Sequence, residues 1–213
     1  MSMVDSLPRE TTVESGGYAK GVAIAVVRHN KDDSGQGRVK VSYPWYSQPR
    51  ESYWARVATP MTGKGRGMYF IPEVGDEVLV AFERGDLRFP YIVGSLWNGV
   101  DKSPASNDDG NNDVRQIRTR KGHKLTFNDG AKGLVQLELN DGKKLSIDDD
   151  GIKLDDAGGN SLVIDSNNGG VVTIQAGLKL SLKATQISIE ASGTLDIKAG
   201  PTLSLKAAMI NIN

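Results

Sequence analysis

The chain has 213 residues, which is enough for one or two domains. Its 26 basic residues balance its 26 acidic residues, so no field of one sign favours binding to nucleic acid or to a membrane. The absence of cysteine excludes a disulfide scaffold and a thiolate metal site. No apolar run has the length of a signal-peptide core or a membrane-spanning helix, so we expect a protein made in the cytoplasm without a cleaved signal of the usual kind.

The first half of the chain has the pattern of a small β-barrel. Residues 1–17 are polar and without pattern, which predicts a flexible or partner-bound arm. Within 18–99 no stretch has helical periodicity, and twelve of the thirteen aromatic residues of the chain lie at or before Trp97. Glycine, proline, aspartate and asparagine separate short alternating segments, which predicts a closed antiparallel barrel. The expected strands are 19–28, 37–43, 52–58, 66–71, 76–83 and 89–97.

The second half repeats one short pattern, in which two apolar residues flank one polar residue. Residues 100–124 are expected to be a linker and the start of this part, and 125–213 carry the repeat. Each copy has the two-residue period of a strand. The eleven pairs are Leu125/Phe127, Leu137/Leu139, Leu145/Ile147, Ile152/Leu154, Leu162/Ile164, Val172/Ile174, Leu180/Leu182, Ile187/Ile189, Leu195/Ile197, Leu203/Leu205 and Ile210/Ile212.

Copies this short need neighbours, because each buries only two large aliphatic side chains. The neighbours can come from one chain, as in a single-chain solenoid, or from several chains wound together. The last repeats follow one another after 7 or 8 residues, which suits one strand and one corner per repeat. We therefore favour a homotrimer whose chains intertwine into a triple-stranded β-helix, or β-prism, over 125–213.

Residues 37–99 carry an ordered set of motifs that identifies a family. The motifs are Pro44-Trp45, Trp54-Ala-Arg56-Val57, Gly63-Lys-Gly-Arg-Gly67, Ile71-Pro-Glu-Val-Gly75-Asp-Glu-Val78, Gly85-Asp86 and Gly94-Ser-Leu-Trp97-Asn. In this order they resemble the oligonucleotide/oligosaccharide-binding (OB) barrel of the spike proteins of contractile injection machines. That family includes phage baseplate assembly protein V, the valine-glycine repeat proteins of type VI secretion, and the spikes of extracellular injection systems.

The resemblance implies an all-β protein, with an N-terminal OB barrel followed by a trimeric needle that pierces a target envelope. Valine-glycine repeat proteins carry a hub domain before this barrel, and some phage spikes carry a lysozyme domain after it. Neither is present here, so the resemblance implies a separate baseplate hub protein at the OB end. It also implies assembly into a phage-tail-like particle or injection machine, with the target envelope contacted only on firing.

The end of the needle is the candidate interface in this chain. The strand pattern still runs at Ile210/Ile212, so we expect an open apolar end with unpaired strand edges. The resemblance implies that a small proline-alanine-alanine-arginine (PAAR) repeat tip protein covers this end. The candidate interface residues are Ala208, Met209, Ile210, Asn211, Ile212 and Asn213.

Residues with other possible chemistry have simpler structural explanations. The glycine-rich loop at 63–67 lacks the spacing of a phosphate-binding loop. Aspartates at 148–150 and 155–156 lie where turns are expected, and the two histidines, His29 and His123, are far apart in sequence. We therefore expect no catalytic residue, no metal and no cofactor.

Two other functions stay open from the sequence alone. An OB barrel can bind single-stranded nucleic acid through aromatic side chains, but the neutral charge argues against it. A trimeric β-helical enzyme that cleaves carbohydrate needs aromatic sugar platforms, and the repeat region holds Phe127 as its one aromatic residue.

Overall fold

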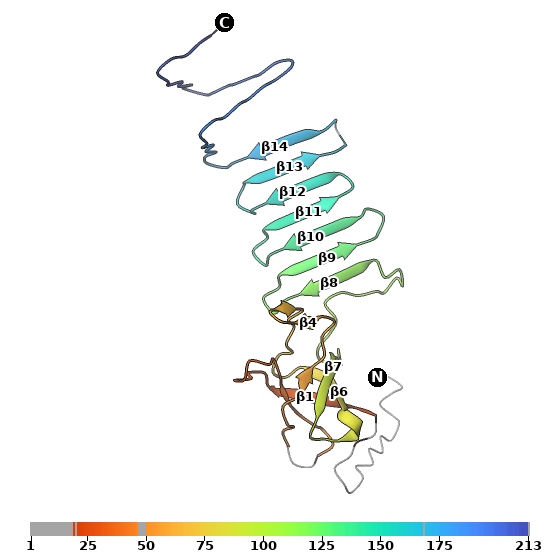
Figure 1. The fold of residues 1–213 in the computed structure, drawn as a ribbon. Coiled ribbons are helices and arrows are strands. Elements are labelled where there is room, and N and C mark those ends of the chain that lie inside the picture. Colours follow the sequence, from red (N-terminus) through yellow and green to blue (C-terminus); the bar gives the residue numbers. More distant parts are fainter. Residues whose placement is uncertain (1–18, 20, 47–49, 168, 213) are drawn as a thin grey trace. The chain divides into compact units, whose positions relative to one another are not determined.

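The chain divides into two compact β units, between Ser106 and Asn107. The computed structural model describes residues 19, 21–46, 50–167 and 169–212. Among these residues the one helical segment is a 3₁₀ turn, η2 (Glu83–Gly85), and no helix is long and apolar enough to cross a membrane. The all-β fold class is thereby confirmed, while the expected arm at 1–17 lies outside the described residues (Figure 1).

The first unit is built on a five-stranded sheet with the order β2-β1-β6-β7-β3. All neighbours in this sheet are antiparallel except β3 and β7, which run parallel. The strands of the unit are β1 (Val22–His29), β2 (Lys40–Ser42), β3 (Arg56–Val57), β4 (Thr62–Gly63), β5 (Arg66–Gly67), β6 (Glu77–Phe82) and β7 (Pro90–Ser95).

Residues before β3 connect the two edges of this sheet. Val39 and Ala55 exchange two main-chain hydrogen bonds, with N–O distances of 3.0 and 2.7 Å, and Ser42 forms a bridge with Glu51. The segment 51–57 therefore pairs with β2 at one end and with β7 at the other. As a result, main-chain pairing runs around the whole unit in a ring.

The core of this unit comes from the alternation of apolar residues along its strands. Every second residue of a strand points to the same face, so Val78, Val80 and Phe82 of β6 all enter the interior. Val27 in β1 and Ile92 in β7 meet them there. Each such side chain contributes roughly 1.5–3 kcal/mol on burial.

The strand expected at 66–71 is shorter than the sequence indicates. Only Arg66–Gly67 is in a strand, and it pairs with β4 in a two-stranded hairpin. The glycine-rich motif explains this, because Gly65 has a positive φ of 65° in the turn. At Gly67 a Cβ would lie 2.8 Å from the carbonyl oxygen of Met61, so the two strands approach as closely as glycine allows.

The second unit is a meander, in which each strand pairs with the strand before it and the strand after it. The seven strands lie in sequence order in one antiparallel sheet (Figure 1). Five-residue strands alternate with short turns rich in aspartate, asparagine and glycine. The strands are β8 (Val114–Arg118), β9 (Lys124–Asn128), β10 (Leu134–Glu138), β11 (Lys144–Asp148), β12 (Gly151–Asp155), β13 (Ser161–Asp165) and β14 (Val171–Gln175).

Two features of this unit differ from the sequence-based expectation. Strands from β8 to β14 take their neighbours from one chain, whereas we expected three chains to wind around one another over the whole repeat. After Gln175, the described residues up to Ile212 contain no strand. The last five apolar pairs, from Leu180/Leu182 to Ile210/Ile212, therefore have no strand partner within the chain.

Candidate functional site

The most extensive candidate surface is one face of the β8–β14 sheet. Its strands are in register, so the residues facing the same side form two columns that run across the sheet. The first column is Ile117, Leu125, Leu137, Leu145, Leu154, Leu162 and Ile174. The second is Arg115, Phe127, Val135, Ile147, Ile152, Ile164 and Val172. We call these two columns together the aliphatic face.

Much of the aliphatic face is open to solvent in the single chain. Leu145 in the middle of the sheet is 39% exposed, Leu154 beside it is 52% exposed, and Val172 near the last edge is 61% exposed. Exposed apolar surface that is continuous over seven strands is uncommon in monomeric proteins, and it marks an interaction surface. We therefore expect another protein surface to bind the aliphatic face.

The opposite face of the same sheet is mostly polar, and several of its side chains pair with one another. Gln116 donates a hydrogen bond to Thr126 across two strands at 3.0 Å. Lys124 and Glu138 form an ion pair with an N–O distance of 3.2 Å. A face made of such pairs needs no partner, so the two sides of the sheet have different roles.

Arg115 is the one charged residue of the aliphatic face. It occupies the place in β8 that Phe127 occupies in β9, at the first edge of the sheet. Its guanidinium lies 2.6 Å from the carboxylate of Asp129. The apolar columns thus begin beside an ion pair.

The sequence located most of this face, with one error of register. Leu137 lies in the first column, but its partner in β10 is Val135, while Leu139 follows the strand. The run Leu134-Val-Gln-Leu-Glu-Leu139 alternates in a way that allows both assignments. Pairing of Val135 with Phe127 and of Leu137 with Leu125 decides between them. Ile117 was missed because it lies before the first predicted pair, in the segment expected to hold the linker and the start of the repeat part.

Residues 176–212 continue the apolar pairs without forming a sheet. The described residues beyond Gly177 are all exposed, including Leu178 at 98%. At the candidate tip interface, Met209 is 77% exposed, Ile210 48% and Ile212 86%, while Asn213 lies outside the described residues. The structure thus leaves the side chains of the candidate tip residues accessible.

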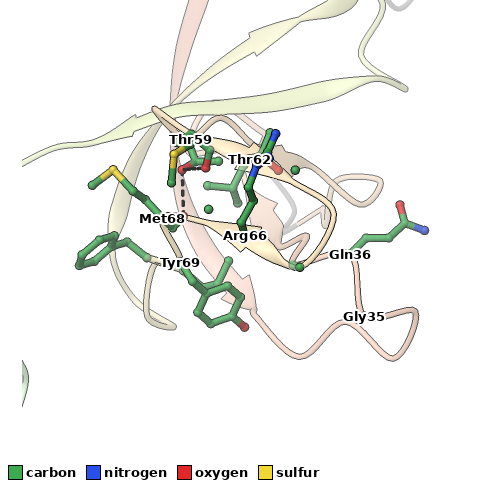
Figure 2. Close-up of a pocket in the computed structure, with 15 residues that line it drawn as sticks. Gly35, Gln36, Thr59, Thr62, Arg66, Met68 and Tyr69 are labelled. Atoms are coloured by element: carbon green, nitrogen blue, oxygen red, sulfur yellow. Dashed lines mark hydrogen bonds between the residues drawn. The ribbon is translucent and has the colours of Figure 1, made fainter.

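Four exposed large hydrophobic residues of the first unit lie next to the β4–β5 hairpin: Met61, Met68, Tyr69 and Phe70. A groove of about 530 Å³ lies between this hairpin, the loop at Gly35–Gly37 and the extended residues Met68–Ile71. Figure 2 shows Thr59 at its wall, where the hydroxyl donates to the carbonyl oxygen of Met68 at 2.9 Å. Tyr69, on the same wall, is 82% exposed. No part of this groove was predicted, because its walls are distant in sequence.

A second groove, of about 610 Å³, contains four of the aromatic residues that raised nucleic-acid binding as an alternative: Tyr43, Tyr46, Tyr53 and Trp54. Tyr43 is 95% buried (5% exposed) and stacks on Trp45 with ring centroids 4.6 Å apart. Its hydroxyl has no hydrogen-bond partner among the described residues, and burial raises its pKa. Arg38 and Lys40 lie 5.5 and 5.4 Å from the centre of the Trp54 ring. Tyr43 and Trp45 thus contribute to the core and Trp54 to cation–π contacts, while Tyr53 is 63% exposed.

Remaining polar clusters have local structural roles. Asp150 accepts hydrogen bonds from Lys132 at 2.8 Å and Asn167 at 2.6 Å, and these contacts lower its pKa. His29 lies 2.7 Å from Glu51, whose pKa it lowers. Within the part of the chain that the structure describes, no three histidine, aspartate or glutamate side chains gather as a metal site would require.

Comparison with known proteins assigns the first unit to a protein family. Residues 23–97 match the Type VI secretion system/phage-baseplate injector OB domain. The chain is 39% identical over 103 residues, 45% of its length, to the type VI secretion system spike protein VgrG3 of Vibrio cholerae serotype O1. It is 34% identical over 111 residues, 50% of its length, to the spike protein VgrG5 of Pseudomonas aeruginosa.

These matches are local in the relatives, since they cover 10% and 13% of those two proteins. The matched region holds the five-stranded sheet of the first unit except Val22, and the whole buried core. The resemblance found in the motifs from Pro44 to Asn98 is confirmed. Residues 23–97 of this chain form an OB domain of the family found in type VI secretion and phage-baseplate spike proteins.

Proposed function

We propose that this chain is the structural spike of a contractile injection machine, in which three copies form a needle that pierces the target envelope. The OB domain supports the assignment to such a machine, because its family is the injector OB domain of type VI secretion systems and phage baseplates. The aliphatic face supports the assembly, and it is the observation that carries the proposal. An apolar face of this extent needs to be covered, and identical copies of the chain provide a matching surface.

Three copies form a closed assembly when their aliphatic faces turn inward around one axis. Each large aliphatic side chain that is about half exposed gains roughly 1 kcal/mol when covered, which makes the gain on the order of 10 kcal/mol per chain. Two sheets stacked face to face would also cover the surface. The threefold arrangement is favoured because the last repeats follow one another after 7 or 8 residues, with room for one strand and one corner.

The proposed position in the machine determines which proteins bind the two ends of the chain. In this proposal the OB unit binds a separate baseplate hub protein, and the other end of the needle binds a small PAAR-repeat tip protein. The spike is assembled from protein made in the cytoplasm, and it takes no cofactor or nucleic acid. Immunogold labelling of a tagged chain in purified sheathed particles tests this. Label at the baseplate end is expected, and label along the sheath, or none, would contradict the proposal.

The tip interface is tested by shortening the chain. Met209, Ile210 and Ile212 expose apolar side chains that a cap protein would bury. Deletion of residues 208–213 should leave three chains per particle and abolish capture of the PAAR-repeat protein in a pull-down. Deletion of residues 1–17, at the other end of the sequence, is the matched control and should leave capture unchanged. Capture by the chain shortened at 208–213 would show that the cap binds elsewhere.

A further inference from the structure

The second groove of the first unit, which we call the aromatic groove, leaves apolar surface and polar atoms without partners. Tyr53 in its lining is 63% exposed. The hydroxyl of Tyr43, also in the lining, and the Nε1 of Trp45, which stacks on Tyr43, are buried atoms with no hydrogen-bond partner among the described residues. Buried polar groups in folded proteins are seldom left unpaired. A ligand that matches this groove therefore brings both apolar atoms and hydrogen-bond acceptors, as a peptide segment does.

The N-terminal segment of the chain is attached beside the aromatic groove. Ala19, the first described residue, donates its amide to the carbonyl oxygen of Gly85 at 2.8 Å. Leu87, two residues after Gly85, is part of the groove lining. Two residues of chain span at most about 7 Å, so the chain before Ala19 joins the unit close to the groove.

The expected arm at 1–17 has enough length to enter this groove. Fully extended, these residues reach about 60 Å, so only part of the arm is needed. Among them Leu7 and Pro8 supply adjacent apolar side chains, and every residue of the arm except Pro8 has both a main-chain amide and a carbonyl.

The charges of the arm are opposite in sign to those of the groove. The arm has three acidic side chains and one basic side chain, which are Asp5, Glu10, Glu14 and Arg9. The groove lining has two basic side chains and one acidic side chain, which are Lys40, Arg50 and Glu51. The Glu51 carboxylate lies 2.7 Å from His29 and 3.5 Å from Lys40, so it is already paired within the unit. An acidic segment is therefore attracted to this groove.

We propose that residues 1–17 bind the aromatic groove of their own chain. Apolar side chains of the arm cover Tyr53, its carbonyl groups accept hydrogen bonds in the groove, and its acidic side chains lie toward Lys40 and Arg50. The bound arm closes the aromatic groove to other ligands. This inference does not depend on the number of chains in the particle.

Cysteine labelling tests the proposal, because the natural chain has no cysteine. In the Tyr53→Cys variant, the rate at which the single thiol reacts with a maleimide reports whether the groove is covered. Removal of residues 1–17 should raise this rate about tenfold, as expected for an arm that is bound about ten times as often as it is free. Tyr69→Cys, in the groove beside the β4–β5 hairpin, is the matched control, since Tyr69 is 82% exposed. Its labelling rate should be the same with and without the arm.

Cross-linking identifies the chain to which the arm binds. The Ser6→Cys/Tyr53→Cys variant, treated with a flexible bifunctional maleimide, should give single chains with an internal link on denaturing gels. Pairs of linked chains would show that the arm binds another copy, and would overturn the inference. Equal labelling of Tyr53→Cys with and without residues 1–17 would also overturn it. A rise of the same size at Tyr69→Cys would do so as well, because removal of the arm would then have loosened the whole unit.

Discussion

Replacement of Leu145 by aspartate tests whether the aliphatic face is the surface that three copies bury. Leu145 lies in the middle of the first column, directly opposite Leu137 and Leu154. In the trimer, three aspartates would meet at one level near the axis. An aspartate has an ordinary pKa near 3.9, so holding it neutral at pH 7 costs about 4 kcal/mol. The cost is about 12 kcal/mol per trimer, or nearly nine powers of ten in the association constant.

Light scattering after size exclusion at pH 7 should therefore find single chains of the Leu145→Asp variant. Below about pH 4 the aspartates accept protons without this cost, so trimers should begin to return. Ser146→Asp is the matched control, because it adds the same charge to the same strand on the polar face, beside Lys153. The Ser146→Asp variant should remain trimeric. Trimers of Leu145→Asp at pH 7 would refute the inward assignment of the aliphatic face.

Three further substitutions test other parts of the structure. Leu195→Asp should prevent trimers in the same way if Leu195 faces the axis of the proposed needle, and native trimer yield by size exclusion would contradict this. Gly151→Ala places a Cβ against the carbonyl oxygen of Ile164 and should lower the free energy of unfolding by about 1–3 kcal/mol, whereas Gly133→Ala, which has room, should not. Arg38→Gln should lower the urea midpoint at pH 7, because Arg38 lowers the pKa of Asp32. The pair of Arg38 and Asp32 stabilises the fold above the ordinary aspartate pKa and loses its effect as pH falls through the lowered pKa. A difference in urea midpoint between Arg38→Gln and wild type that persists unchanged at the lowest pH would contradict the assignment.

Alternation of apolar residues was enough to predict the longer strands of the first unit and most of the aliphatic face. Val78, Val80 and Phe82 enter the core as a two-residue period requires. The period fails where two registers satisfy it, as at Leu137, because only pairing with the neighbouring strand selects one. It also fails at Met68–Ile71, where an apolar run has no strand partner.

The spacing of the repeats did not predict where pairing within one chain ends. Seven residues separate Leu145 from Ile152, and the two-residue turn at Asp149–Asp150 joins their strands into a hairpin. Seven residues also separate Leu180 from Ile187, where no strand forms. The difference lies in the turn, since Gly151 accepts a backbone conformation that Gln186, at the same place in its repeat, disfavours. The groove beside the β4–β5 hairpin was not predicted, because it combines the loop at 35–37 with residues between 57 and 71.

The mass of the native particle tests the central claim most directly. One chain has a mass of 22.9 kDa, so three chains have a mass of about 69 kDa. Light scattering of the full chain behind size exclusion, at micromolar concentration, should give about 69 kDa, independent of dilution over the measured range. A mass near 23 kDa would contradict the needle of three chains, and a mass near 46 kDa would favour two stacked sheets instead.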